Sequence, residues 1–397
     1  MVSRPSVREV VAVSEFRALW IAHAQSRLGD QLARVAISVL VFDRTSSASL
    51  TALTYALSFL PPLVSAPLLT GLADRFPRRT VMVVTESVRA GLVAVMAIPG
   101  LPLVALAGLL IAVVSLQPLY SAARNSILPS VLDGDAYVVG VGITSATDSA
   151  VQVLGFAVGG ILIGLTGPHV ALGLNAVTFL VSALLVRIRV GHHRPRNAVR
   201  KAGRSLSDGV RLIWSDRQLR GLLGLLYLYG FYIAPEGLAV AYAADEGAGH
   251  AAVGLLMAAD PVGAIIGSLL LSRWLPAAWR SRALGPLAVV SGIPMVASAF
   301  YHSVPAAIAL WTLVGVLSSY TMIVHATFVR RVPDGQRGQV IGLASAGLQA
   351  AQGLGIVVAG VLADVTTPAT AVGIMGAAGA LLALPAWRSW TTEGSRS

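Results

Sequence analysis

Long apolar runs separated by short polar breaks make up most of the chain. A helix needs about 20 mainly apolar residues to cross the hydrocarbon core of a bilayer. By this measure the pattern predicts twelve membrane-spanning helices, at residues 17–42, 49–71, 80–99, 101–122, 138–165, 168–188, 219–243, 251–272, 283–301, 304–328, 339–363 and 368–388. Breaks such as "PGLP" and "GPH" are so short that the helices they join must be antiparallel neighbours.

One connection is much longer than the others and divides the predicted helices six to six. It is polar and basic, and it predicts an N-terminal six-helix bundle at 1–190, a linker at 191–218 and a C-terminal six-helix bundle at 219–397. Within the linker, "SLSDGVRLIW" has the pattern of a short amphipathic helix for the anionic inner surface of a membrane.

The two halves also share a sequence pattern at an offset of 200 residues. Residues 142–162 and 342–362 match at ten positions, among them Gly142 with Gly342, Gln152 with Gln352 and Gly160 with Gly360. Paired bundles of related sequence are how many alternating-access carriers are built. The pattern therefore predicts an all-α membrane protein made of two pseudo-symmetric halves.

Composition agrees with this prediction and adds an orientation. Of the 397 residues 55% are hydrophobic and only 12% are charged, and the mean hydropathy is +0.76. With the N-terminus inside, 25 of the 29 basic residues lie in the inner segments and only Arg44 lies in an outer loop. The positive-inside rule then places both termini in the cytoplasm and the chain in the cell membrane. The same asymmetry explains the net charge of +11 without nucleic acid.

Several kinds of site are excluded by what the chain lacks. It has no cysteine, which excludes disulfides, thiolate metal sites and iron–sulfur clusters. Lys201 is the only lysine and does not lie in a phosphate-binding loop, so we expect no ATP site, no metal and no other cofactor. The sequence contains no nucleophile and base at a spacing typical of an enzyme. The N-terminus lacks the apolar core of a signal peptide.

The stretch "LADRFPRR" between the second and third predicted helices resembles a signature of the major facilitator superfamily, G-x-L-A-D-R-x-G-R-R/K. Thr70 and Pro77 replace the two glycines, and the matching residues are Leu72, Ala73, Asp74, Arg75, Arg78 and Arg79. The resemblance implies the twelve-helix fold of this family, usually monomeric, with a small-molecule substrate. It also implies a conformational latch in which Asp74 caps a helix of the opposite half and the arginines bind carbonyls or acids at helix ends. The alternative is a simple basic anchor at the inner surface.

The fifth predicted helix carries "LGFAVGGILIG", which is similar to the G-P-x-x-G-G motif of exporters in this family. Gly155, Gly159 and Gly160 match, whereas Phe156 replaces the proline. We expect these small residues to let the two halves approach closely and pivot. The segments "SILPSVLDGD" and "RRVPDGQRG" resemble the bacterial drug, siderophore and macrolide exporter branch. The arginine that the family carries in its fourth helix is absent, since no base precedes Arg124 there.

Charged residues inside predicted helices are candidates for function, because each is costly in a bilayer. The first helix carries four polar residues at i, i+4, i+7 and i+11, a spacing that puts them on one stripe: His23, Arg27, Asp30 and Arg34. We weigh a substrate or coupling role for this stripe evenly against a structural ladder of ion pairs. Glu86 and Arg89, three residues apart, are expected to form a structural pair.

Three acids in predicted helices have no base close by in sequence. They are Glu236, Asp260 and Asp148, and we rank Glu236 first and the other two equally behind it as candidates for proton coupling. Pro235 and Gly237 predict a bend in the helix that carries Glu236. The alternative for each acid is a satisfied contact between helices. Aromatic residues in the same helix, Tyr227, Phe231 and Tyr232, line either the substrate cavity or the packed core.

The sequence thus predicts a secondary transporter that works by alternating access. The preferred interpretation is proton-coupled efflux of hydrophobic or amphipathic small molecules such as drugs or natural products. The alternative is a proton-coupled importer of a nutrient or metabolite, which the Phe156 replacement keeps open. Substrate and protons are the expected partners, within the lipid bilayer.

Overall fold

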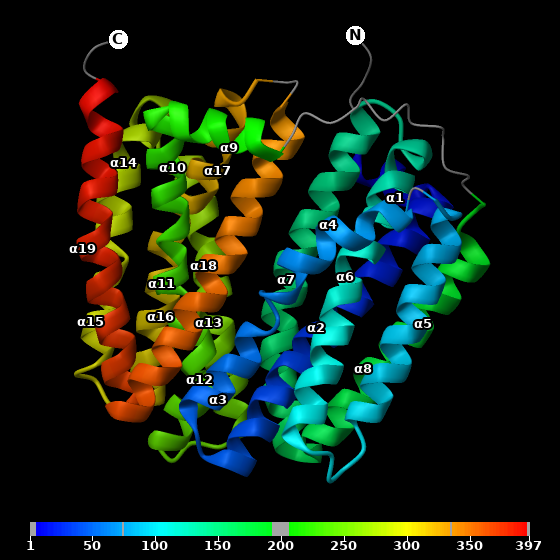
Figure 1. The fold of residues 1–397 in the computed structure, drawn as a ribbon, viewed down its shortest axis with the longest axis horizontal. Coiled ribbons are helices and arrows are strands. Elements are labelled where there is room, and N and C mark those ends of the chain that lie inside the picture. Colours follow the sequence, from blue (N-terminus) through cyan, green and yellow to red (C-terminus); the bar gives the residue numbers. More distant parts are fainter. Residues whose placement is uncertain (1–4, 74, 193–205, 334–335, 395–397) are drawn as a thin grey trace. The chain divides into compact units, whose positions relative to one another are not determined.

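The computed structural model describes residues 5–73, 75–192, 206–333 and 336–394. Contacts between residues divide the chain into two units, which are coloured along the sequence in Figure 1. Unit 1 contains Met1–Leu40 and Leu60–Val199, and unit 2 contains Val41–Phe59 and Arg200–Ser397. The short segment Val41–Phe59 therefore lies with the C-terminal half, although the sequence places it in the N-terminal half.

Every element in the described residues is a helix, and no strand occurs among them. Unit 1 contains most of α2 (Ser14–Thr45) together with α1 (Val7–Ala12), α4 (Pro61–Ala73), α5 (Arg78–Met96), α6 (Leu103–Val131), α7 (Asp135–Thr166) and α8 (Pro168–Arg189). Unit 2 contains α3 (Ala48–Ala56), α9 (Leu206–Ser215), α10 (Arg217–Tyr227), α11 (Tyr229–Tyr232), α12 (Ala234–Asp245), α13 (His250–Trp274), α14 (Ala277–Val290), α15 (Gly292–Ser298), α16 (Val304–Ser318), α17 (Tyr320–Arg331), α18 (Arg337–Val365) and α19 (Pro368–Gly394). The prediction of an all-α fold is confirmed.

Each of the twelve predicted spans coincides with a helix or with a series of short helices. Within the described residues, nine of these are long and apolar enough to cross a membrane by length and composition alone. The other three positions hold α2 and α5, which carry several charged residues, and the shorter apolar helix Arg282–Ser298. That these three also span the membrane remains a prediction.

Several predicted helices are interrupted, and tyrosines from neighbouring helices bind carbonyls close to the interruptions. The span 219–243 consists of α10, α11 and α12, with Pro235 in the first turn of α12; the helix is thus interrupted next to Pro235, and the bend itself stays a prediction. The Tyr320 hydroxyl donates to the Leu225 carbonyl at 3.0 Å, just before the first break. The Tyr232 hydroxyl donates to the Ala288 carbonyl, next to the break between α14 and α15. Such bonds satisfy backbone groups that lipid cannot.

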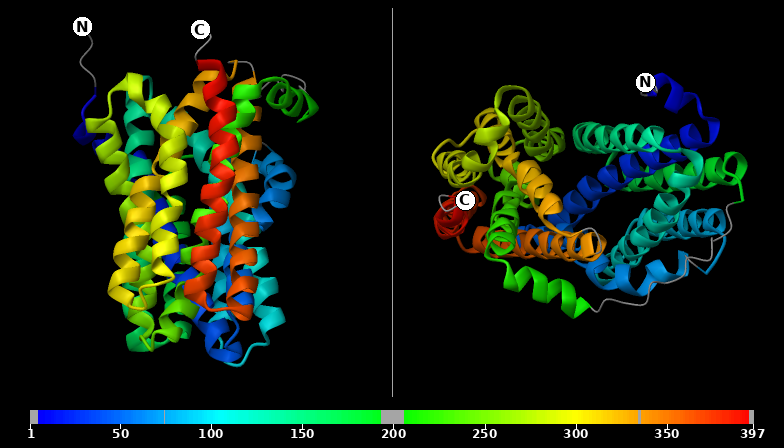
Figure 2. Two further views of the ribbon diagram at one scale, coloured as in Figure 1. Left: turned by 90° about the vertical axis from the view of Figure 1, so that its left-hand side faces the viewer. Right: turned by 90° about the horizontal axis from the view of Figure 1, so that it is seen from above.

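The order of elements repeats between the two units at an offset of about 200 residues. The helices α6, α7 and α8 of unit 1 correspond to α16–α17, α18 and α19 of unit 2. The packing repeats too, because α5 packs on α8 and α4 on α6, whereas α14–α15 pack on α19 and α13 on α16. In both views of Figure 2 the long helices within a unit run side by side. The sequence repeat therefore extends to the whole order of helices.

The helix α9 lies across one end of the long helices of unit 2, as Figures 1 and 2 show. Gly209 packs against Gln339 and Leu343 of α18, while Trp214 leaves 67% of its surface exposed. The predicted short helix in the linker is thus present, and its location on a membrane surface remains a prediction. The preceding residues 193–205 lie outside the described residues.

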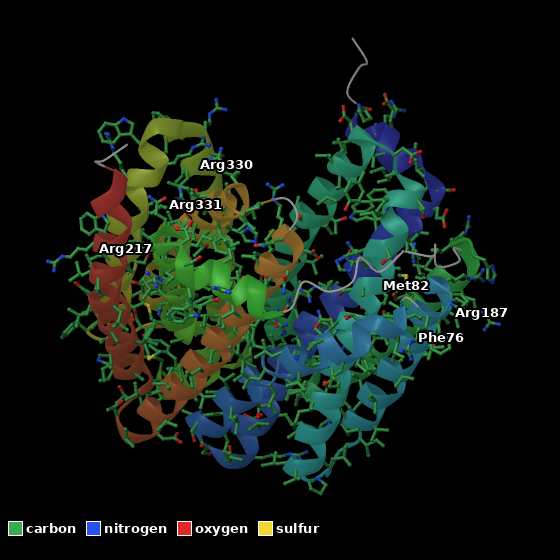
Figure 3. The ribbon with its side chains drawn as sticks, turned by 45° about the horizontal axis from the view of Figure 1, so that its top comes forward. Phe76, Met82, Arg187, Arg217, Arg330 and Arg331 are labelled. Carbon is green, nitrogen blue, oxygen red and sulfur yellow. The ribbon has the colours of Figure 1, made fainter. Side chains whose placement is uncertain are left out.

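Basic residues gather at this same end of unit 2, where Figure 3 labels Arg217, Arg330 and Arg331. Asp216 accepts hydrogen bonds from the backbone of Gln218 and Leu219 and pairs with Arg331 at 3.1 Å. Burial acts to raise the pKa of Asp216, but the Leu219 N–H and the Arg331 guanidinium outweigh it and lower the pKa. These bonds fix the start of α10 against the end of α17.

Candidate functional site

Unit 1 contains a continuous series of charged side chains from α2, α5 and α7. His23 Nε2 lies 2.8 Å from Asp148 Oδ1, and Arg27 lies 3.9 Å from the same oxygen. Arg27 is also 4.0 Å from Asp30. Arg89 then bonds both Asp30, at 2.7 Å, and Glu86, at 2.9 Å. Residues that the sequence suggested as two separate groups therefore form one network.

The two ends of this network differ in how open they are. Glu86 and Arg89 are fully buried, and the Arg89 guanidinium also lies 4.1 Å from the centre of the Phe179 ring. At the other end, the side chains of Asp148 and Arg27 are 37% and 24% exposed. The buried end, Glu86 with Arg89, has the character of a structural ion pair. The partly exposed end, Asp148 with Arg27, can exchange partners more easily.

Two sequence predictions are changed by this network. Asp148 is not the unpaired acid that was expected, because His23 and Arg27 both contact it. Its partners are more than 120 positions away in the chain, so a search for nearby bases could not find them. The Glu86–Arg89 pair is confirmed, and Asp30 joins it as a further partner of Arg89. Arg34 is half-buried on the same helix as His23.

Arg124, which the sequence analysis placed after the fourth predicted span, lies within α6 and belongs to this region. It is only 8% exposed, and among the described residues its guanidinium makes no hydrogen bond or ion pair. Its electrostatic neighbours are Tyr120, His23 and Asp148. A single base in the long apolar run of α6 was the available indication.

Unit 2 holds its charges in a different way. Glu236 and Asp260 are both 3% exposed, and each accepts a short hydrogen bond from a tyrosine. Tyr55 Oη lies 2.6 Å from Glu236 Oε2, and Tyr229 Oη lies 2.6 Å from Asp260 Oδ2. Tyr229 is also an electrostatic neighbour of Glu236 and Tyr55, so the four side chains form one acid–phenol cluster.

Local structure places both acids beside proline. Pro235 is the second residue of α12, and Glu236 follows it in the first turn, where the partial positive charge of the helix end favours a carboxylate. Asp260 directly precedes Pro261 inside α13. Both acids are buried in the protein, and their role in proton coupling stays a prediction. The two phenols were not predicted as partners.

The aromatic residues proposed for a substrate cavity have different surroundings. Tyr232 is fully buried, packs against Gly379 and bonds a backbone carbonyl, so it belongs to the packed core rather than to a cavity. Tyr227 and Phe231 are half-buried and contact Gly347 and Gly379 respectively. For these two the cavity role stays a prediction.

The predicted latch lies partly outside the described residues, because Asp74 is among those not described. Leu72 and Ala73 end α4, and Arg75 is exposed. The two following arginines bond carbonyls within unit 1: Arg78 donates to Ser126 of α6 at 2.6 Å, and Arg79 donates to Arg187 of α8. Figure 3 labels Arg187 and, from the stretch that leads to Arg78, Phe76. The expected bonds to carbonyls near helix ends are present, whereas the capping role of Asp74 stays a prediction.

The glycines of α7 also act within unit 1. A Cβ on Gly155 would lie 2.5 Å from Gln31, and one on Gly159 would lie 3.3 Å from Leu32, both on α2. Gly160 is buried in the same stretch. These glycines were expected to bring the two halves together. The contacts of Gly155 and Gly159 instead bring α7 close to α2 of the same unit.

Comparison with known proteins identifies the family. The model for the Major Facilitator Superfamily matches residues 19–245 and 229–397. The chain belongs to the major facilitator superfamily. It is 26% identical to the multidrug efflux pump Tap of Mycobacterium tuberculosis over 361 residues, which cover 85% of this chain and 84% of that protein.

Other similar proteins are carriers as well. The chain is 25% identical to the lysophospholipid transporter LplT of Yersinia pestis over 287 residues, covering 66% of this chain and 64% of that protein. Among solved structures, a bacterial homologue of the human lysosomal transporter Spinster has a TM-score of 0.76 at 12% identity, covering 96% of both chains. This superfamily member is therefore a multi-pass membrane transporter of small molecules.

Proposed function

We propose that this member of the superfamily exports hydrophobic or amphipathic small molecules in exchange for protons, by alternating access. The acid–phenol cluster of unit 2 is the observation that carries the proposal. The carboxyl groups of Glu236 and Asp260 are both buried. Neither residue has a base close by in the sequence. Among the described residues the Asp260 carboxyl accepts a hydrogen bond only from the Tyr229 hydroxyl and forms no ion pair, so no cation fixes its charge.

The physical requirement for coupling is an acid that can be neutral or charged at accessible cost. A buried carboxyl bonded to a single phenol keeps both states available, whereas a carboxyl locked to an arginine stays ionised. Proton entry supplies about 2.3 kcal/mol for each charge and each 100 mV of membrane potential, in addition to any pH gradient. On this basis Asp260 joins Glu236 as a leading candidate.

Similarity supports the direction and the substrate class. Tap is a multidrug efflux pump, which supports export of drugs, and LplT is a lysophospholipid transporter, which supports an amphipathic substrate. Import is the alternative, and Phe156 in place of the proline of the exporter motif keeps it open. Vesicles with an imposed pH gradient separate the two, because an exporter accumulates substrate in everted vesicles and an importer loses it. We further propose a monomer with both termini in the cytoplasm.

The experiment that tests the proposal measures dye transport in everted vesicles with and without an uncoupler. We expect Asp260→Asn and Glu236→Gln to abolish uphill transport while the protein still binds substrate. Asp245→Asn is the matched control, because Asp245 is an exposed acid at the end of α12. Undiminished uphill transport in both variants, or transport in the parent that ignores the uncoupler, would contradict proton coupling.

A further inference from the structure

The connection between α13 and α14 carries basic and aromatic side chains on the surface of unit 2. Its sequence from Arg273 to Arg282, "RWLPAAWRSR", contains three arginines and two tryptophans, and we call it the basic connection. Trp274 ends α13 with 76% of its surface exposed. Trp279, in the first turn of α14, is 58% exposed. Tryptophan is on average a highly buried residue, so two such rings indicate contact with surroundings other than water.

The membrane depth of the basic connection follows from the helix before it. The helix α13 is one of the candidate membrane spans among the described residues, and Trp274 is its last residue. Tryptophan at the end of a spanning helix lies at the level of the lipid headgroups, where its ring meets lipid and its N–H meets polar groups. Figure 1 shows α14 in the part of unit 2 that also holds α9. On the orientation proposed above, the basic connection borders the inner headgroup layer.

The three arginines of the basic connection have different surroundings. Arg280 donates to the Leu275 and Ser272 carbonyls, each at 3.1 Å. Carbonyls at the end of a helix have no partner inside the helix, so Arg280 completes the end of α13. Arg273 and Arg282 are exposed and, within the part of the chain that the structure describes, form no ion pair or hydrogen bond.

No acid in the described surroundings balances these two arginines. From Pro261 to Pro333 the chain contains five arginines and no Asp or Glu. The helices that pack on α14 are α10, α15, α16, α17 and α19, and none of their described side chains is acidic. Asp216, just before α10, already pairs with Arg331. The basic connection thus presents a positive surface that attracts anions.

We propose that the basic connection binds the phosphate of an anionic phospholipid headgroup, with Arg273 and Arg282 as its charge partners. A guanidinium donates two parallel hydrogen bonds to phosphate oxygens. The inner leaflet of a cell membrane is rich in anionic lipids. The exposed Trp274 and Trp279 favour a lipid over a free phosphate ion, because an ion gives the two indole rings no apolar contact. Arg282 lies 5.7 Å from the centre of the Trp279 ring, so one charge and one ring are held together at the site.

This site binds a component of the membrane and not the transported molecule. It goes beyond the proposed function, because lipid binding at this connection is the same for either direction of transport. The simple alternative is that these arginines only orient the chain, as the positive-inside rule requires. That alternative predicts that removing exposed arginines elsewhere has the same effect on lipid binding as removing these two.

The experiment places one reporter beside the site, which the absence of cysteine from the chain allows. Leu269→Cys, at a position 64% exposed and one turn before Arg273 on α13, is labelled with a fluorophore. Ile293→Cys on α15, at a position 59% exposed, reports on lipid elsewhere around unit 2. The full-length protein is placed in nanodiscs of phosphatidylcholine, one chain to a disc. Nitroxide-labelled phosphatidylglycerol or nitroxide-labelled phosphatidylcholine is then added as the quencher.

We expect phosphatidylglycerol to quench the Leu269→Cys reporter more strongly than phosphatidylcholine does, and to saturate. Both lipids should quench the Ile293→Cys reporter equally. Arg273→Gln combined with Arg282→Gln should lower the relative affinity for phosphatidylglycerol about fivefold for each arginine removed. Arg273→Lys combined with Arg282→Lys should keep most of the preference, because lysine keeps the charge.

Arg8→Gln combined with Arg44→Gln is the matched control, because it removes the same charge from exposed positions elsewhere, and it should leave the preference unchanged. Equal quenching of the Leu269→Cys reporter by the two lipids, or an equal loss of preference in this control, would overturn the site. A preference that inorganic phosphate removes, and sodium chloride of equal ionic strength does not, would overturn the lipid as occupant in favour of a free anion. None of these measurements involves transport, so the proposed function stands or fails separately in the uncoupler experiment.

Discussion

Removal of Arg89 is the single substitution that we expect to destabilise unit 1 most, judged from the contacts of its buried network. The Arg89 guanidinium bonds Asp30 at 2.7 Å and Glu86 at 2.9 Å, and Glu86 is fully buried. In Arg89→Met the apolar part of the side chain is kept, so it still packs beside Phe179. What is lost is the only base that the described residues place against Glu86.

The magnitude follows from what remains behind. Breaking a buried ion pair by removing one partner costs about 3–5 kcal/mol, because the other charge stays buried without compensation. For a folding unit of 150–250 residues each kcal/mol lowers the melting temperature by about 2–4 °C. We therefore expect Arg89→Met to lower the melting temperature of unit 1 by about 6–20 °C.

The assay is thermal unfolding of the purified protein in detergent, with hydrogen exchange to locate the change. Exchange should accelerate in peptides of α2 and α5 and stay unchanged in α13 and α16. Adding Glu86→Gln to Arg89→Met removes the stranded charge, so the double variant should recover about half of the loss. Arg8→Met, at an exposed arginine of the same unit, is the matched control and should shift melting by at most about 2 °C.

Two outcomes would refute this reasoning. A shift of less than about 2 °C for Arg89→Met would mean that Glu86 takes up a proton or finds water at little cost. A double variant that is less stable than the single one would mean that the hydrogen bonds of Glu86, and not its charge, matter most. Ser26 and Ser182 are the polar neighbours that could supply such bonds.

Two further predictions concern packing and pH. Gly263→Ala should destabilise unit 2 by about 1–3 kcal/mol in thermal melts, because a Cβ there would meet the Thr312 carbonyl. Gly173→Ala is the control and should be neutral or slightly stabilising, because the space around Gly173 is open. Equal melting temperatures for the two variants would contradict the close approach of α13 and α16. Asp216→Ala should cost about 1 kcal/mol at pH 7, because Asp216 caps α10. Since the pKa of Asp216 is lowered in the folded protein, its contribution is present above its unfolded pKa and is lost as the pH falls through the folded one. The melts of parent and variant should therefore converge under acid conditions, and a constant difference would rule out the carboxylate as the stabilising group.

The sequence was sufficient for the pattern of helices and for the identity of the buried acids. Apolar runs of about 20 residues locate spans reliably, because lipid imposes one length on every crossing helix. It was also sufficient for the contact of Glu86 with Arg89 within one helical turn, and for an irregularity of the helix next to Pro235. These features depend on spacing along a single helix, which a sequence shows directly.

The partners of the charges could not be predicted in the same way. Asp148 lies beside His23, and Tyr55 beside Glu236, only because helices distant in the chain pack together. Tyr55 was harder still, since its segment belongs by sequence to the N-terminal half and by contacts to unit 2. Spacing identifies which face a residue occupies but not which helix lies opposite.

The two units treat buried charge differently, and this difference bears on which of them can move protons. In unit 1 every described acid of the network faces a base, so a proton added there must displace an ion pair. In unit 2 the acids face phenols, which donate a hydrogen bond without bringing a charge. Adding a proton to Asp260 breaks no ion pair within the described residues and removes a buried charge instead. Pairing in unit 1 therefore favours a rigid scaffold, while the phenol-bonded Asp260 of unit 2 can gain a proton without breaking an ion pair among the described residues, as the proposed coupling requires.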